Sequence, residues 1–287
     1  MFAITGITGQ VGGSVANNLL TEGLSVRAVV RNREKGAVWK ERGCELALAE
    51  MTDARALTAA FTGAETVFVL IPPTFDPTPG FPETRAVIAA LKTALEAARP
   101  KKVVCLSTIG AQATEPNLLS QLGLVERELA ELSMPIAFLR AAWFIENAAW
   151  DVGPARENGT ISSFLQPLDK RFPMVAVEDI GALGAKMLQE DWTGQRVVEL
   201  EGPARVSPLE LAAAFAQILG KPISAEPVAR ETWEALFLSQ GMKNPAPRMR
   251  MLDGFNEGWI EFEGGEAASV KGKTGLETAL LRLVRRA

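Results

Sequence analysis

The stretch Ala3–Leu20, AITGITGQVGGSVANNLL, most constrains the fold. A short apolar run precedes glycines at positions 6, 9, 12 and 13, and a helical pattern follows them. Helix N-termini attract phosphate, and glycines let the backbone approach a pyrophosphate closely. Between a strand and a helix, the pattern predicts a dinucleotide-binding turn, although its spacing is Gly-x-x-Gly-x-x-Gly rather than the commonest Gly-x-Gly-x-x-Gly. A glycine-rich turn without a ligand is the alternative.

Strand and helix patterns alternate through the first half of the chain. Helices are expected over 10–22, 34–42, 53–61, 83–98 and 118–132, with Asp53 as an N-cap. Apolar runs predict strands over 1–5, 24–30, 44–49, 65–71, 101–107 and 135–140. Strands separated by helices form parallel sheets through right-handed crossovers. The fold class predicted is therefore α/β, a Rossmann-type doubly wound parallel sheet with a smaller C-terminal α/β lobe.

The alternation breaks after Arg140. We expect residues 1–150 to form the nucleotide-binding Rossmann domain and 151–287 a smaller, mostly helical lobe on the substrate side, with later segments returning to the sheet. Helices are predicted over 178–190 and 206–221, the second capped by Ser207 with Glu210 three residues on, and a strand over 196–202. The Gly/Glu-rich stretch 263–268 is expected to be a loop, and the tail an amphipathic helix.

Composition excludes several function classes. The formal charge of −4 and the pI of about 5.3 argue against a large nucleic-acid footprint. No apolar run approaches the roughly 20 residues of a membrane span, and the first residues already resemble a strand rather than a targeting signal. A cytoplasmic location is the resulting expectation. Two cysteines, Cys44 and Cys105, are too few for a zinc site or a disulfide framework, so no metal is expected.

The chain contains no histidine and no tyrosine. Catalysis by Ser-His-Asp or Cys-His groups is therefore excluded, as is the Tyr-x-x-x-Lys pair by which most short-chain reductases transfer a proton. Hydride transfer itself needs mainly proximity and orientation, because the cofactor carries the reactivity. The missing acids favour acceptors such as quinones, whose reduced anion takes a proton from water, over unactivated ketones.

The end of the second strand bears on the choice of cofactor. An NAD site usually places Asp or Glu about 20 residues after the glycines, whereas VVRNREK supplies Arg31, Arg33 and Lys35. A guanidinium can bind a 2′-phosphate that a carboxylate would repel. This position favours NADPH over NADH, and a solvated basic turn is the alternative.

Together these segments resemble the NmrA-like branch of the atypical short-chain dehydrogenase/reductases. The chain matches the family's glycine start with ITGITGQVGGSV and its basic strand end with VRNREK. Further similar segments are EMTDARALTAAFTGAETVFVL, IAFLRAAWFIEN and VAVEDIGALGAKML. The resemblance covers most of the chain up to about Glu190, and within the family it is nearest to bacterial NADPH-dependent quinone and dye reductases.

The resemblance implies NADP(H) as the cofactor and assigns residues to it. The pyrophosphate would be lined by Gly6, Thr8, Gly9, Gln10, Val11 and Gly12. The 2′-phosphate would be held by Arg31 and Lys35. Met51 would lie beside adenine, with Leu70, Ile71 and Pro72 along the adenosine and ribose. Backbone near Ala142, Trp143 and Phe144 would meet the nicotinamide.

Acceptor-contacting residues are expected at the carboxyl ends of the strands. Phe75, in the loop IPPTFDPTPGF, and Phe144 could cover a flat acceptor or pack the junction with the lobe. Ser107 could hydrogen-bond a carbonyl, as in related enzymes, or cap a strand end. Asn147 could orient a polar group or satisfy backbone. Leu122 stands where many family members carry a lysine, so no mechanism based on that lysine is expected and no catalytic residue is assigned.

Two functions follow from these observations. The first is an NADPH-dependent oxidoreductase that transfers hydride to a quinone or a similar conjugated, electron-poor acceptor without a Tyr-Lys pair. The alternative is a non-catalytic NADP(H)-sensing regulatory protein of the NmrA type. An epimerase is disfavoured, since it normally uses the absent tyrosine. The expected partner is a small aromatic or conjugated substrate, with neither nucleic acid nor membrane, and a homodimer is one expectation for the assembly.

Overall fold

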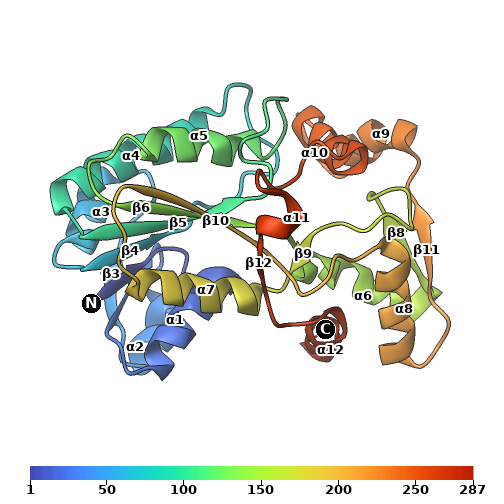
Figure 1. The fold of residues 1–287 in the computed structure, drawn as a ribbon, viewed down its shortest axis with the longest axis horizontal. Coiled ribbons are helices and arrows are strands. Elements are labelled where there is room, and N and C mark those ends of the chain that lie inside the picture. The colour runs from blue at the N-terminus through green and yellow to red at the C-terminus, as the bar shows by residue number, and fades with distance from the viewer. Residues whose placement is uncertain (287) are drawn as a thin grey trace.

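A computed structural model of the chain describes residues 1–286 (Figure 1). Its centre is an eight-stranded sheet in the order β12-β10-β6-β5-β4-β1-β2-β3, in which every neighbouring pair is parallel. The strands are β1 (Phe2–Ile4), β2 (Val26–Val30), β3 (Glu45–Leu48), β4 (Thr66–Val69), β5 (Lys102–Thr108), β6 (Ile136–Ala141), β10 (Gln195–Glu201) and β12 (Val270–Lys271). The predicted parallel sheet is confirmed.

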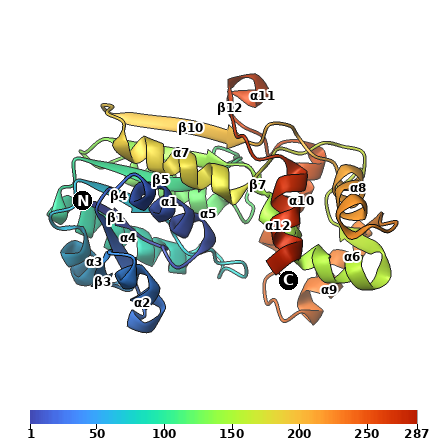
Figure 2. The ribbon, with the colours of Figure 1, turned by 90° about the horizontal axis from the view of Figure 1, so that it is seen from below.

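Helices cover both faces of this sheet (Figures 1 and 2). One face carries α1 (Gln10–Thr21), α2 (Arg33–Glu41) and α7 (Val177–Gln189), and the other carries α3 (Ala54–Phe61), α4 (Pro82–Ala98) and α5 (Ser120–Leu129). The sheet separates two clusters of buried apolar side chains, one under each layer of helices. Strands buried on both faces read as continuous apolar runs, which is why the sequence pattern identified them.

The predicted helices begin and end within a few residues of their observed bounds, and two predicted caps are present. The Asp53 carboxylate accepts a hydrogen bond from the Ala56 N–H at 2.9 Å. Ser207 and Glu210 form a reciprocal capping box at the start of α8 (Pro208–Leu219). Such caps satisfy N–H groups that the helix itself leaves unpaired, so a local sequence pattern can locate them.

The lobe is built from short elements around two small parallel pairs. β7 (Trp143–Phe144) pairs with β9 (Met174–Val175), and β8 (Thr160–Ser163) pairs with β11 (Ser224–Pro227). Around them lie the short 3-10 helices η1 (Ile145–Asp151) and η2 (Arg230–Thr232) and the helices α6 (Val152–Asn158), α9 (Trp233–Ser239), α10 (Ala246–Glu257) and α12 (Leu276–Arg286). The sequence did not predict β8 and β11, because polar TISS and SAEP lack the apolar alternation of a strand.

The prediction of a loop over 263–268 was wrong in part, because α11 (Gly265–Ala268) is a single helical turn. Tertiary contacts hold it. The Ser269 hydroxyl contacts the Glu266 carbonyl at 2.9 Å and the buried Glu201 carboxylate at 2.5 Å. Glu199 accepts a hydrogen bond from the Gly264 N–H at 3.0 Å. Contacts between distant residues therefore override the weak helix preference of a glycine-rich stretch.

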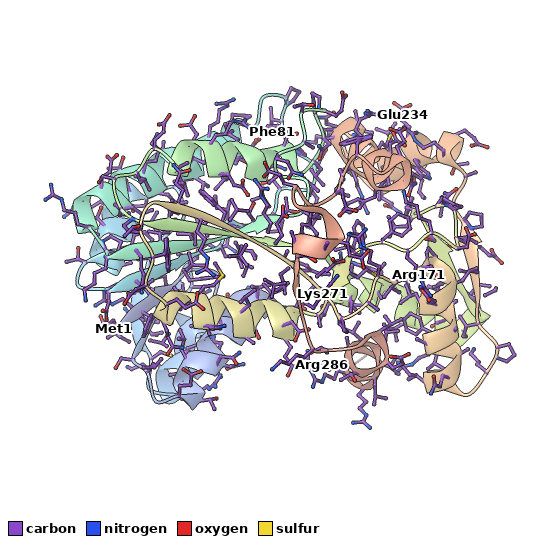
Figure 3. The ribbon with its side chains drawn as sticks, viewed as in Figure 1. Met1, Phe81, Arg171, Glu234, Lys271 and Arg286 are labelled. Atoms are coloured by element: carbon purple, nitrogen blue, oxygen red, sulfur yellow. The ribbon has the colours of Figure 1, made fainter. Side chains whose placement is uncertain are left out.

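The chain passes between sheet and lobe repeatedly. It leaves the sheet after β6, returns at α7, leaves again after β10, returns at β12 and ends on the lobe in α12. Asp179, in the first turn of α7, holds the last crossing by accepting hydrogen bonds from the Thr274 N–H at 2.9 Å and the Lys273 N–H at 3.1 Å. Figure 3 labels Lys271, at the end of the edge strand β12, and Arg286, at the end of α12.

Candidate functional site

The glycine turn lies between β1 and α1, as predicted. Gly6 has a φ of +64°, and its carbonyl oxygen accepts a hydrogen bond from the Gly9 N–H at 2.9 Å. A Cβ atom at Gly12 would lie only 2.4 Å from the Gly6 carbonyl oxygen. The turn therefore folds directly against the first turn of α1, which only glycine at these two positions allows.

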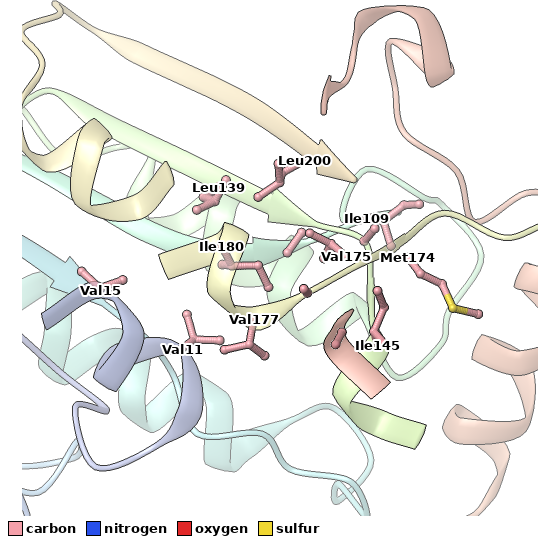
Figure 4. Close-up of a cluster of buried hydrophobic side chains, with 14 of the residues drawn as sticks. Val11, Val15, Ile109, Leu139, Ile145, Met174, Val175, Val177, Ile180 and Leu200 are labelled. Atoms are coloured by element: carbon pink, nitrogen blue, oxygen red, sulfur yellow. The ribbon is translucent and has the colours of Figure 1, made fainter. Parts of the chain in front are cut away.

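The start of α1 offers free N–H groups to an anion. Gly9 is the N-cap and provides no capping side chain, and the first turn contains no acidic residue. Thr8, Gly9 and Gln10 are exposed, whereas Val11 is buried and packs beside Val177 of α7 (Figure 4). Val11 can therefore contribute only its backbone N–H. A phosphate group fits this end of the helix, because the unpaired N–H groups and the helix dipole both favour negative charge.

Thr5 joins the glycine turn to the end of β4, a role that the sequence analysis missed. Its hydroxyl accepts a hydrogen bond from the Leu70 N–H at 2.7 Å, and the Thr5 N–H donates to the Phe68 carbonyl at 3.0 Å. The Leu70 side chain then lies against Gly6. The segment after β4 therefore begins beside the glycine turn, and an adenosine could lie along it. Leu70 and Ile71 in this segment are half-buried, and Pro72 is exposed.

The basic end of β2 lies at the same edge of the sheet. Arg31, Arg33 and Lys35 are exposed, and Asn32 between them caps α2 by accepting the Glu34 N–H at 2.7 Å. Within residues 1–286, no carboxylate forms an ion pair with Arg31 or Lys35. Met51, after the neighbouring strand β3, is buried. Arg31 and Lys35 can therefore bind an added phosphate without first breaking an ion pair.

Aromatic side chains occupy the start of the lobe. Trp143 and Phe144 in β7 are half-buried, and the Trp143 ring meets Phe255 of α10 edge to face at 5.3 Å between centroids. Asn147 in η1 is exposed, and Trp150 is 87% exposed. The Glu146 carboxylate accepts a hydrogen bond from the Val177 N–H at 3.0 Å, which fastens η1 to the start of α7. Burial raises the pKa of Glu146.

The loop after β4 reaches the lobe. Asp76 accepts hydrogen bonds from the Asn244 N–H at 2.7 Å and the Lys243 N–H at 2.8 Å, just before α10. These backbone hydrogen bonds, that of Lys243 first, hold the pKa of Asp76 below its usual value. Phe75 beside it is 61% exposed. The loop thus holds an apolar ring at the surface where sheet and lobe meet.

Ser107 lies at the end of β5 as predicted, but its surroundings differ from the expectation. It is buried, and its hydroxyl is hydrogen-bonded to the Glu126 carboxylate at 2.5 Å. Because an ionised carboxylate can only accept, the single O–H of Ser107 is committed and cannot also be donated to a substrate carbonyl. The assignment of Ser107 as a substrate donor therefore does not fit the structure.

Glu126 belongs to a buried ion-pair network that the sequence analysis missed. Arg140, near the end of β6, donates to Glu126 at 2.7 Å, to Glu263 at 2.8 Å and to Glu199 at 3.2 Å. Burial opposes its charge, but these carboxylates, with Glu126 foremost, raise the pKa of Arg140. The network fixes the ends of β5, β6 and β10. The half-buried Leu122, one turn before Glu126 on α5, offers no proton.

Other chemistry is absent from the described part of the chain. Residues 1–286 contain no group of three or more His, Cys, Asp or Glu side chains placed to hold a metal ion. Cys44 and Cys105 are buried, unpaired thiols. No helix in this range has the length and apolar content needed to cross a membrane.

Known proteins share this architecture. The NmrA-like family matches residues 1–257. An NAD(P)H azoreductase of Xenophilus azovorans is 28% identical over 244 residues, which are 84% of this chain and 82% of that protein. The structure of an Escherichia coli NADPH-dependent quinone oxidoreductase complexed with NADPH superposes with a TM-score of 0.81, at 23% identity and over 99% of both chains. A Citrobacter sp. triphenylmethane reductase gives 0.80, at 20% identity and over 99% of both chains.

The match spans nine-tenths of the chain and includes the glycine turn, the basic end of β2 and the Val177–Gln189 helix. The resemblance inferred from these segments is thereby confirmed. This chain belongs to the NmrA-like family.

Proposed function

We propose that the protein is an NADPH-dependent oxidoreductase that reduces quinones or similar conjugated, electron-poor acceptors. One observation carries the proposal: a helix start without a capping side chain, on a tight glycine turn, lies at the same sheet edge as Arg31 and Lys35, which form no ion pair within residues 1–286. The relatives named for azo, quinone and dye reduction support it. When bound, NADPH supplies the hydride.

The residues of this chain would hold the cofactor along the ends of β1, β2, β3 and β4. The pyrophosphate would receive hydrogen bonds at Gly6, Thr8, Gly9, Gln10, Val11 and Gly12. Arg31 and Lys35 would bind the 2′-phosphate through charge-assisted hydrogen bonds. Met51, Leu70, Ile71 and Pro72 would line the adenosine, and the backbone at Trp143 would position the nicotinamide.

The acceptor would lie between the loop after β4 and the start of the lobe, in contact with Phe75, Phe144 and Asn147. The absence of histidine and tyrosine and the commitment of Ser107 to Glu126 leave no side chain of the assigned site as a strong acid. An acceptor whose reduced form is a stabilised anion needs no such acid, since water can supply the proton. This reasoning supports quinones and conjugated dyes over simple ketones.

A panel of quinones and cationic dyes, mixed with the purified protein and NADPH, tests this proposal through the nicotinamide absorbance band. NADPH oxidation is expected with at least the quinones. Arg31→Glu should reverse the preference from NADPH towards NADH, because the carboxylate repels the 2′-phosphate and accepts ribose hydroxyls. An unchanged preference would show that the 2′-phosphate lies elsewhere.

The alternative is a regulatory protein that binds NADP(H) without turnover. The leucine at position 122 and the committed Ser107 favour it as much as they favour an undemanding acceptor. Tight NADPH binding without oxidation of any acceptor in the panel would select this second function.

A further inference from the structure

Arg248, in the first turn of α10, is half-buried, and no carboxylate of residues 1–286 forms an ion pair with it. Its guanidinium lies over the Phe237 ring of α9, 4.4 Å from the centroid. Its one side-chain hydrogen bond within residues 1–286 is a long contact from Nη1 to the Met242 sulfur at 3.8 Å. Burial lowers the pKa of Arg248.

Other arginines in comparable positions are neutralised. Arg140 contacts three carboxylates, and Arg205 pairs with Glu201 at 3.0 Å and Glu261 at 2.7 Å. Arg250, two residues further along α10 and also half-buried, lies 3.6 Å from Asp253. Moving a charge from water into the protein is costly when no opposite charge pairs with it. The unpaired guanidinium of Arg248 therefore destabilises the fold unless a bound anion neutralises it.

The beginning of α10 lies against the loops that follow β4 and β5. The Leu118 N–H, in the loop after β5, donates to the Pro247 carbonyl at 2.9 Å. Asp76, in the loop after β4, binds the backbone just before α10. Ligands of parallel α/β sheets bind at this edge, beyond the carboxyl ends of the strands. Arg248 is therefore held beside the region in which the acceptor is proposed to lie.

The position of Phe255 shows how far Arg248 lies from the proposed reaction centre. The two residues are seven apart on α10 and so share one face of the helix, separated by about 10 Å along its axis. Phe255 contacts the Trp143 ring edge to face, and Trp143 is the proposed nicotinamide neighbour. An acceptor reduced near Trp143 could thus carry a substituent as far as Arg248 if it extended about 10 Å along this face of α10.

We propose that Arg248 binds an anionic substituent, such as a sulfonate or a carboxylate, on the conjugated acceptor. The proposal rests on the reductase function proposed above and narrows its substrate class. The Phe237 ring lies beside the guanidinium, and apart from the long Nη1 contact with Met242 its N–H groups have no side-chain or backbone acceptor within residues 1–286. Those N–H groups match two oxygens of a planar or tetrahedral anion, and the bound anion would neutralise the exposed edge of the cation.

The test compares naphthoquinone with naphthoquinone sulfonate as acceptors, with NADPH in excess. Arg248→Met keeps the apolar stem and removes the charge. We expect the ratio of kcat/KM for the sulfonate to that for the neutral quinone to fall about 10- to 100-fold, mainly through KM. Arg248→Lys should restore part of the ratio. Arg250→Met, which removes an already paired cation from the same helix, should leave the ratio unchanged.

An equal loss with both acceptors, or an unchanged ratio, would overturn the proposal. A second measurement separates it from the reductase function. If the wild-type protein oxidises no NADPH with either quinone, the proposed function fails, and binding of the sulfonate is measured instead by quenching of tryptophan fluorescence. The wild type must then bind at least about tenfold more tightly than Arg248→Met. Equal affinity would refute the role of Arg248 independently.

Folding of the variant provides the remaining control. Because Arg248→Met removes a half-buried charge that lacks a partner, its Tm should equal or exceed that of the wild type. A clearly lower Tm would assign the guanidinium a structural role on Phe237 and would contradict the proposal.

Discussion

Replacing Gly12 by alanine tests whether the close approach of the turn and α1 creates the cofactor site. The added Cβ would lie 2.4 Å from the Gly6 carbonyl oxygen, 2.6 Å from its carbon and 2.9 Å from the Ile7 nitrogen. Nonbonded heavy atoms are normally about 3.5 Å apart, so the turn must move away from the helix by about 1 Å. All three atoms are backbone, and no rotamer change can relieve the overlap.

The two contributions to stability have opposite signs. Alanine is favoured over glycine inside a helix by about 1 kcal/mol. Overpacking costs about 1–3 kcal/mol, so the net effect is a loss of up to about 2 kcal/mol. NADPH binding should suffer more, because the N–H groups aimed at the phosphate move with the turn. Loss of one such charge-assisted hydrogen bond, about 1.5–3 kcal/mol, raises the Kd for NADPH about 10- to 100-fold.

Gly153→Ala is the matched control. Gly153 lies exposed in α6, and a Cβ there would meet nothing within 4 Å. This variant should therefore keep the wild-type Kd and show an equal or higher Tm. Fluorescence titration with NADPH and thermal unfolding measure both quantities. Wild-type affinity in folded Gly12→Ala would refute the assignment of the turn to the cofactor.

Three further predictions concern other parts of the structure. Burial raises the pKa of Asp151 to about 6 from 3.8, so the native state binds the proton more tightly and stability falls as the pH rises between these values. In urea unfolding, Asp151→Asn should increase the free energy of unfolding by at most about 3 kcal/mol above pH 7 and leave it unchanged below about pH 4. Glu126→Gln should cost about 1–3 kcal/mol, because Arg140 and Ser107 each lose one charged partner. Glu65→Gln, at an exposed ion pair, should lower the Tm much less. Equal effects of the two variants in thermal unfolding would contradict this. Asp76→Ala removes the hydrogen bonds that hold the loop after β4 to Lys243 and Asn244. The variant should raise the KM for the acceptor with little change in Tm. An unchanged KM would show that the loop does not contact the acceptor.

The sequence predicted the elements whose cause is local. The glycine turn, the cap at Asp53 and the capping box of Ser207 and Glu210 each depend on residues within a few positions of one another. Strands buried on both faces were equally recognisable, because their apolar runs contrast with the polar turns around them. These signals identified most strands and helices of the sheet, and in the structure the glycine turn and the basic end of β2 lie at one edge of it.

Contacts between distant residues were not predictable in the same way. Thr5 meets Leu70, and Ser107 meets Glu126, because parallel strands bring their ends together. A serine at a strand end has the same local pattern whether its hydroxyl faces a ligand or a buried carboxylate. Arg248 was overlooked for a related reason, since only its packing on Phe237 distinguishes an unpaired cation from an ordinary surface arginine.

The repeated passage of the chain between sheet and lobe restricts how the protein could open. A hinge at a single linker lets two domains rotate apart, but here several connections, one of them fixed by Asp179, would have to bend in concert. Large rigid-body opening is therefore suppressed. Acceptors of different size would be accommodated by local rearrangement of the loop that carries Phe75, so breadth of substrate range would depend on that loop rather than on domain motion.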